Sequence, residues 1–95
     1  MATGTLAKRF HVSGRVQGVG YRYFAERVAL RMRVAGYVKN LYDGRVEVYA
    51  IGAAGQLAEL LDELRRGPFM ARVIRVEEIE AEMLAEYSGD FRIER

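Results

Sequence analysis

A chain of 95 residues, 51% hydrophobic and 29% charged, has the composition of one soluble folded domain and is too short for two. It contains no cysteine, which excludes disulfide cross-links, thiolate metal sites and a cysteine nucleophile. Its 15 basic and 13 acidic residues leave a net charge of +2, a balance that requires neither a nucleic acid nor a membrane as partner.

The sequence also lacks the features of an exported or membrane-bound protein. Its apolar runs are far shorter than the roughly 18 residues of a membrane span, and its start carries neither a signal peptide nor a lipidation site. We therefore expect a cytoplasmic protein with a single domain over residues 1–95. Residues 1–5, which are small and polar, are expected to be flexible.

The first predicted element is a strand, because Phe10 and Val12 alternate with Arg9 and His11. A glycine-rich loop over residues 14–20 follows it. Beyond the loop, apolar residues recur at the spacing of a helix with one buried face: Tyr21, Ala25, Val28 and Met32.

Two strands are predicted next, over residues 37–41 and 46–51, because Asp43-Gly44 between them is a strong hairpin signal. A second amphipathic helix then ends at Gly67-Pro68, and its apolar face is made by Leu57, Leu60, Leu61 and Leu64.

The last part of the chain predicts a strand over residues 71–80 and a short final strand at Phe91 and Ile93. The apolar alternation of the longer strand slips between Val73 and Val76, which indicates a β-bulge. The acidic, irregular stretch between the two strands predicts no element.

The predicted order is βαββαβ with a short C-terminal strand. This order is typical of a ferredoxin-like α+β sandwich, in which an antiparallel sheet carries both helices on one face. The other face of the sheet is expected to be open to solvent and to display four side chains: Arg9, His11, Glu47 and Tyr49.

The junction of the first strand, the loop and the first helix has the features of an anion-binding site. Gly18 and Gly20 allow successive N–H groups to turn toward one point, and the helix beginning near Tyr21 adds unpaired N–H groups and its positive dipole end. Arg22 lies in the first helical turn, where its planar fork can bind two phosphate oxygens. The residues alone leave open a plain glycine turn with Arg22 as a solvated charge.

Two runs of the sequence resemble signatures of the acylphosphatase family: GRVQGVGYR at residues 14–22 and GYVKNLYDGRVE at residues 36–47. The resemblance continues to the final strand and covers nearly the whole chain. It implies hydrolysis of a small-molecule acyl phosphate to a carboxylate and inorganic phosphate, without a metal, a cofactor or a covalent enzyme intermediate. We separately expect the chain to be a monomer.

The resemblance also implies roles for particular residues. Arg22 matches the arginine that binds the substrate phosphate, and Asn40 matches the asparagine that orients the attacking water. The phosphate is expected to be surrounded by the backbone N–H groups of Val16, Gln17, Gly18, Val19, Gly20 and Tyr21.

Some single residues allow other interpretations or depart from the family pattern. Asn40 lies before a turn, where asparagine often bonds the local backbone. His11, on the open face, is expected to be structural or to have no role rather than to be catalytic. Arg33 stands where the family often has glycine at the end of the first helix, and a left-handed backbone there would cost about 1 kcal/mol. Tyr37 stands where the family frequently has tryptophan.

A binding module without catalysis is the main alternative function. Ferredoxin-like sheets can bind single-stranded RNA on their open face through stacked aromatic residues. The second hairpin strand, however, lacks the aromatic-rich RNA-binding consensus, and Glu47 would oppose a polyanion, so no nucleic-acid partner is expected. A third possibility is a protein of this fold that relays a phosphorylated intermediate or serves a partner protein.

Overall fold

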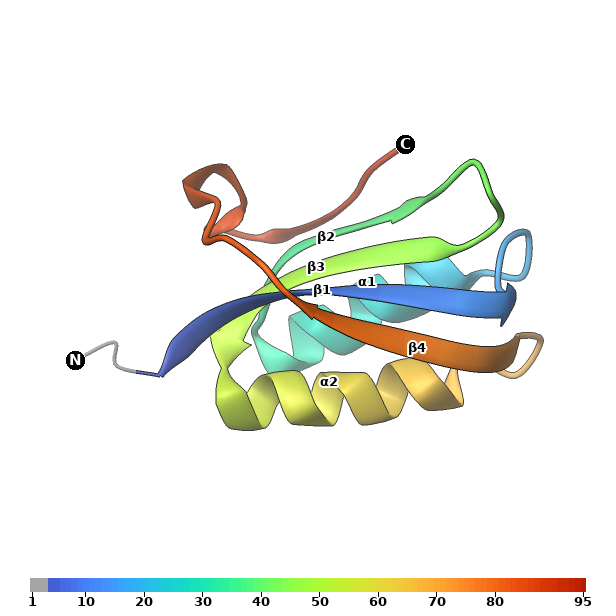
Figure 1. The fold of residues 1–95 in the computed structure, drawn as a ribbon, viewed down its shortest axis with the longest axis horizontal. Coiled ribbons are helices and arrows are strands. Elements are labelled where there is room, and N and C mark those ends of the chain that lie inside the picture. The colour runs from blue at the N-terminus through green and yellow to red at the C-terminus, as the bar shows by residue number, and fades with distance from the viewer. Residues whose placement is uncertain (1–3) are drawn as a thin grey trace.

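Two helices cover one face of a five-stranded sheet in the computed structural model, which describes residues 4–95 (Figure 1). The elements are β1 (Thr5–Arg15), α1 (Tyr21–Met32), β2 (Ala35–Asn40), β3 (Val46–Ala53), α2 (Ala54–Arg66), β4 (Arg72–Glu80), the 3₁₀ turn η1 (Ala85–Tyr87) and β5 (Phe91–Ile93). Neither helix is long and apolar enough to cross a membrane. Within the start that we expect to be flexible, Thr5 pairs with Ala53 of β3, and residues 1–3 lie outside the described residues.

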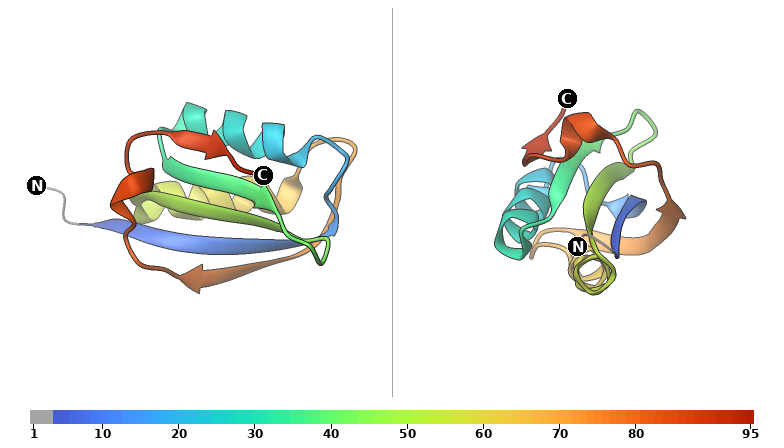
Figure 2. Two further views of the ribbon diagram at one scale, coloured as in Figure 1. Left: turned by 90° about the horizontal axis from the view of Figure 1, so that it is seen from above. Right: turned by 90° about the vertical axis from the view of Figure 1, so that its left-hand side faces the viewer.

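The sheet has the strand order β4-β1-β3-β2-β5. Its first four strands are antiparallel, as predicted. The expectation of a wholly antiparallel sheet is wrong for β5, which runs parallel to β2 with Gly36 opposite Phe91. After β4, residues 81–90 carry the chain across one end of the sheet to the edge of β2, so β5 begins at the end of the sheet where β2 begins (Figure 2).

The predicted bulge lies in β4 at Ile74. Ser13 of β1 pairs with Arg75 and the next residue, Gly14, pairs with Val73, so Ile74 has no opposite residue. The extra residue returns the side chains to the correct face of the strand. Val73 and Val76 consequently both pack against the core between the sheet and the helices.

That core holds the start of α1 in place. Phe10 and Val48 from the sheet and Leu60 from α2 are fully buried in it. The Tyr21 hydroxyl, at the first residue of α1, donates a hydrogen bond to the Leu64 carbonyl at 2.7 Å. The two helices are therefore cross-linked where α1 leaves the glycine loop.

The other face of the sheet is only half open, which corrects the expectation of an open face. Tyr49 is fully buried there, stacked on Tyr37 with ring centroids 5.4 Å apart, and Tyr87 of η1 covers both rings. The Tyr49 hydroxyl donates to the Glu82 carbonyl (2.6 Å) and accepts from the Leu84 N–H (2.7 Å). The stretch for which the sequence predicts no element thus closes this half of the face.

The uncovered half is organised around the half-buried carboxylate of Glu47. It accepts hydrogen bonds from the Tyr37 hydroxyl (2.6 Å) and His11 Nε2 (2.9 Å), while Arg45 donates to His11 Nδ1 (3.0 Å). Burial alone would raise the pKa of Glu47, but the bonds from Tyr37 and His11 and the charge of Arg9 outweigh burial and lower the pKa. His11 therefore joins β1 to the hairpin and has a structural role.

We predict that Glu47→Gln destabilises the protein at neutral pH by about 1–2 kcal/mol, because an acceptor of charge-assisted hydrogen bonds is lost. A depressed carboxyl pKa stabilises the fold above its ordinary value of 4.5, and this contribution disappears as the pH falls through the lower pKa of the folded state. The difference in unfolding free energy between wild type and variant, measured with urea, should therefore shrink below about pH 4.5. Glu59→Gln, on an exposed part of α2, is the control, and a difference that does not change with pH would contradict the prediction.

Arg33 is the C-cap residue at the end of the α1 helix, and its backbone has the left-handed conformation considered for this position in the sequence. Its φ is 60° and its ψ 36°, and its N–H donates to the Leu30 carbonyl at 3.2 Å. The N–H of Val34 donates to the Ala29 carbonyl at 3.0 Å, which completes the helix end. Arg33 is the only residue other than glycine with positive φ among residues 4–95, so the sequence tolerates strain at this position.

We predict that Arg33→Gly raises the free energy of unfolding by about 1 kcal/mol, because glycine adopts this conformation without steric cost. Arg27→Gly, in the exposed middle of the same helix, should lower it by about 1 kcal/mol. Thermal unfolding of both variants provides the measurement. Destabilisation by Arg33→Gly would show that side-chain contacts of Arg33 outweigh the backbone strain.

Candidate active site

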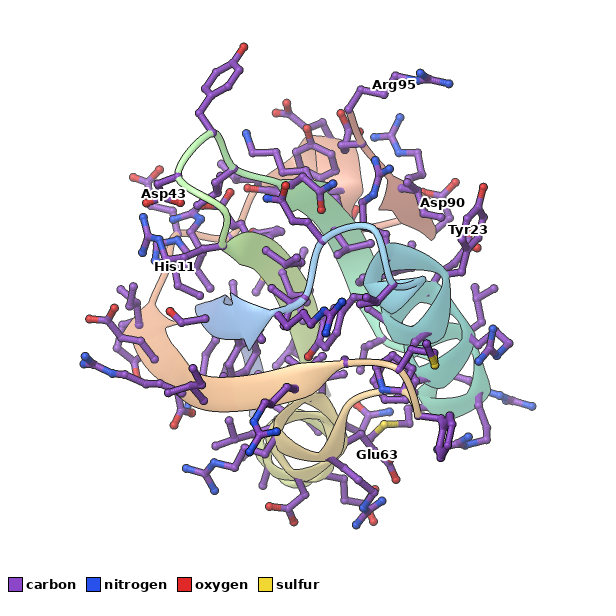
Figure 3. All side chains as sticks on the ribbon, turned by 90° about the vertical axis from the view of Figure 1, so that its right-hand side faces the viewer. His11, Tyr23, Asp43, Glu63, Asp90 and Arg95 are labelled. Carbon is purple, nitrogen blue, oxygen red and sulfur yellow. The ribbon has the colours of Figure 1, made fainter. Side chains whose placement is uncertain are left out.

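Three connections meet at one end of the molecule: the loop from β1 to α1, the β2–β3 hairpin and the connection from α2 to β4 (Figures 1 and 2). Figure 3 looks onto this end. Tyr23 of α1 lies on one side of the loop, while His11 and Asp43 lie on the other. The loop therefore lies between the first turn of α1 and the hairpin that follows Asn40.

The loop turns by means of two glycines with left-handed backbones. Gly18 has φ 75° and Gly20 has φ 81°, and Gly20 is the N-cap of α1. The Phe24 N–H donates to the Gly20 carbonyl at 3.0 Å, which is the first turn of the helix. The N–H groups of residues 21–23 precede that turn and have no intrahelical acceptor, so they and the helix dipole make this end of α1 attractive to an anion.

A cavity of about 190 Å³ lies against the start of the helix. Its lining residues come from the loop, the first turn of α1 and the end of β2: Val16, Gly18, Gly20, Tyr21, Arg22, Tyr23 and Asn40. The structure thus brings both residues implied as catalytic to one cavity, although they are 18 positions apart in the sequence. Two of the six residues expected to offer N–H groups, Gln17 and Val19, are not among the lining residues.

Arg22 is half-buried, and its guanidinium is held by the end of the chain. Its Nη1 donates to the Glu94 carbonyl at 3.2 Å, and the Glu94 N–H in turn donates to the Val38 carbonyl of β2 at 2.8 Å. A neutral carbonyl orients the guanidinium without cancelling its charge, so Arg22 keeps its attraction for an anion. Sequence reasoning missed Glu94, because a main-chain carbonyl leaves no signature in the residue type.

Asn40 contributes a buried acceptor to the site. Its Oδ1 is buried and accepts no hydrogen bond from any of residues 4–95. The local turn role considered for Asn40 is filled by Asp43, whose Oδ1 accepts from the Arg45 N–H at 3.1 Å. Leaving a buried acceptor unpaired costs about 1–3 kcal/mol, which suggests that this oxygen is kept for a donor that enters the cavity.

The lining residues include no carboxylate and no imidazole. The Tyr21 hydroxyl donates to the Leu64 carbonyl, and burial raises the pKa of Tyr21. The hydroxyl therefore stays protonated and is not available to accept a proton from water. Within the part of the chain that the structure describes, no group of three or more His, Cys, Asp or Glu side chains could hold a metal ion. The arrangement combines positive charge, unpaired N–H groups and one amide acceptor, which suits binding of a phosphate beside a water molecule.

Gln17 takes part in the site in a way that the sequence did not reveal. Its side chain leaves the loop and donates from Nε2 to two carbonyls of the hairpin, those of Leu41 (2.8 Å) and Arg45 (2.9 Å). Val19 packs against the hydrophobic core. The only signal in the sequence was a polar side chain of considerable length within a glycine-rich loop.

Comparison with known proteins identifies the family. The family model for acylphosphatases matches residues 8–93. The acylphosphatase of Solibacter usitatus is 55% identical over 75 residues, which cover 79% of this chain and 78% of the relative. That of Archaeoglobus fulgidus is 49% identical over 78 residues, or 82% and 88% of the two chains. The chain belongs to the acylphosphatase family, as the resemblance indicated.

The fold agrees with this family. The crystal structure of the acylphosphatase from Bacillus subtilis superposes with a TM-score of 0.88 at 37% identity, covering 95% of this chain and 99% of the other. The ferredoxin-like α+β fold predicted from the order of elements is therefore confirmed, with the parallel β5 as an addition.

Proposed function

We propose that this member of the acylphosphatase family hydrolyses acyl phosphates in the cavity between residues 16–20 and Asn40. The observation that carries the proposal is that Asn40 lines the same cavity as Arg22 and the start of α1, while its Oδ1 is buried and has no hydrogen-bond partner among residues 4–95. An acceptor held beside an anion-binding helix end can place a water molecule next to a bound phosphate.

The phosphate end of the substrate binds at the start of α1. Arg22 and the free N–H groups of the loop and the first helical turn contact its oxygens, over which negative charge spreads during phosphoryl transfer. These donors are held in position by the Tyr21 and Glu94 hydrogen bonds before the substrate arrives. The protein therefore spends little free energy on reorganisation in the transition state.

Asn40 orients the water. Its Oδ1 accepts a hydrogen bond from the water and leaves a lone pair of the water oxygen free to attack phosphorus. A neutral amide suits this position, because a carboxylate would be repelled by the phosphate.

The reaction needs no group that the cavity lacks. The water oxygen forms a bond to phosphorus, and the bond from phosphorus to the acyl oxygen breaks with its electron pair on the departing carboxylate. A proton of the water passes to a phosphate oxygen, since no carboxylate or imidazole lines the cavity. A carboxylate is a stable leaving group, so charge stabilisation and positioning suffice, and we propose that no cofactor takes part.

We further propose that the chain acts as a single-domain monomer on a small-molecule substrate. The support is that Arg22, Asn40 and the start of α1 already meet in one cavity within a single chain, so the proposed roles call for no residue from a second copy. We propose no nucleic-acid partner, because Tyr37 and Tyr49 are buried beneath Tyr87 and cannot stack on bases. The cytoplasmic location stays a prediction.

Kinetics with benzoyl phosphate in chelator-treated buffer distinguish the role proposed for Arg22 from that proposed for Asn40. Arg22→Ala should lower kcat/KM by about 100-fold or more and should weaken inhibition by inorganic phosphate, because the charge that binds phosphate is lost. Asn40→Ala should lower kcat by a similar factor of about 100 and leave phosphate inhibition nearly unchanged, because only the water loses its partner.

Arg27→Ala, an exposed arginine on the same helix, is the matched control and should retain full activity. An inactive wild type would contradict the proposed function. Full activity of Arg22→Ala, or loss of phosphate inhibition in Asn40→Ala, would contradict the assigned roles. Salt-dependent binding of single-stranded oligonucleotides by an inactive wild type would favour the binding-module alternative.

A further inference from the structure

We propose that Gln17 is a positioning residue that fixes Asn40 relative to the phosphate-binding loop by clamping the β2–β3 hairpin to that loop. The inference rests on the proposed function, since it concerns how the water and the phosphate are kept in register.

The sheet creates the need for such a clamp. The loop follows β1, whereas Asn40 ends β2, and β3 lies between these two strands. Two strand spacings correspond to about 10 Å. The two halves of the site therefore belong to backbone segments that are not neighbours in the sheet.

The Gln17 side chain spans this separation. Its backbone lies between Val16 and Gly18, which both line the cavity. Its Nε2 donates to the carbonyl of Leu41, the residue directly after Asn40, and to the carbonyl of Arg45 on the other side of the hairpin. One side-chain amide thus binds both sides of the β2–β3 turn, next to Asn40.

The two carbonyls offer one acceptor to each proton of the Gln17 side-chain amide, so the amide is held at two points. The distances of 2.8 and 2.9 Å are those of good hydrogen bonds, and the side chain is half-buried. A methionine has the same length but no donor, and a glutamate would direct negative charge at two carbonyl oxygens. Glutamine is therefore the residue type that this bridge requires.

The hairpin has support of its own, which separates positioning from folding. The Leu41 N–H donates to the Arg45 carbonyl (2.8 Å), and the Gly44 N–H donates to the Leu41 carbonyl (3.2 Å). The Asp43 carboxylate adds a bond from Arg45 Nε at 2.8 Å. The turn closes without Gln17, so Gln17 chiefly determines where the turn and Asn40 lie against the loop.

Loss of the bridge should therefore change turnover more than binding. Arg22 and the start of α1, which bind the phosphate, are held by Glu94 and Tyr21 through hydrogen bonds that involve neither Leu41 nor Arg45. The water, in contrast, moves with Asn40, and a displacement of about 1 Å can reduce a rate by up to about 100-fold.

The test compares Gln17→Met with Gln56→Met in the full chain. Gln56 is the matched control, because its side chain also bridges two segments, donating to the Met32 carbonyl (2.9 Å) and accepting from the Ala53 N–H (2.8 Å). It lies in the first turn of α2, and the start of α2 is at the opposite end of the molecule from the β1–α1 loop (Figure 1). Both variants should show a similar, small fall in the midpoint of urea unfolding. Only Gln17→Met should lower kcat for benzoyl phosphate, by about tenfold or more, with KM and phosphate inhibition changed by less than about threefold.

A double variant asks whether Gln17 acts through Asn40. In an Asn40→Ala background, adding Gln17→Met should cause little further loss of kcat, because the group that it positions is already absent. Independent, multiplicative losses would overturn the positioning role, and so would equal kcat for Gln17→Met and wild type.

Gln17→Glu provides a second variant of native length. When its carboxyl is protonated it regains one donor, so its kcat relative to wild type should rise as the pH falls toward the range where a glutamate protonates. A flat ratio would overturn the proposal, as would unfolding of both Gln17 variants, which would assign the bridge to folding.

The outcomes also separate this inference from the proposed function. An inactive wild type overturns both. An active wild type with a fully active Asn40→Ala removes the role of Asn40 and this inference with it. Loss of activity in Asn40→Ala but not in Gln17→Met contradicts the inference alone.

Discussion

The site depends on one constraint, namely that the first N–H groups of a helix cannot be satisfied by the helix itself. Gly18 and Gly20, both left-handed, bring the chain into α1 so that these donors border a cavity. Arg22 adds the one full positive charge among the lining residues. In the function that we propose, these main-chain donors and Arg22 bind and polarise the phosphate, and the remaining task for a side chain is to place a water.

The remaining structure keeps distant segments aligned on these donors. Tyr21 ties the start of α1 to the end of α2, and Glu94 supplies a carbonyl that orients the guanidinium of Arg22. Gln17 ties the loop to the hairpin that carries Asn40. Each of these hydrogen bonds ends on a neutral main-chain carbonyl, so each fixes a position without bringing a negative charge toward the phosphate.

The parts of the fold that depend on periodicity were predictable from the sequence, including both helices, the hairpin and the bulge at Ile74. Both implied catalytic residues also share one cavity, although their roles stay predictions. The direction of β5 and the cover over Tyr49 were not predictable, because residues 81–90 have no apolar alternation and their contacts are distant in sequence. The hydrogen bonds from Gln17 to the hairpin and from Arg22 to Glu94 end on main-chain carbonyls, which every residue carries, so the residue types do not reveal these partners.

The central claim is that backbone N–H groups at the start of α1 bind the phosphoryl group, and a titration of the ¹⁵N-labelled protein with inorganic phosphate tests it most directly. We expect the amide resonances of Gly18, Gly20, Tyr21 and Arg22 to shift together along one saturable curve, while that of Leu57 in α2 stays unchanged. Shifts that centre on the polar face around Glu47 and leave the start of α1 unaffected would contradict the account.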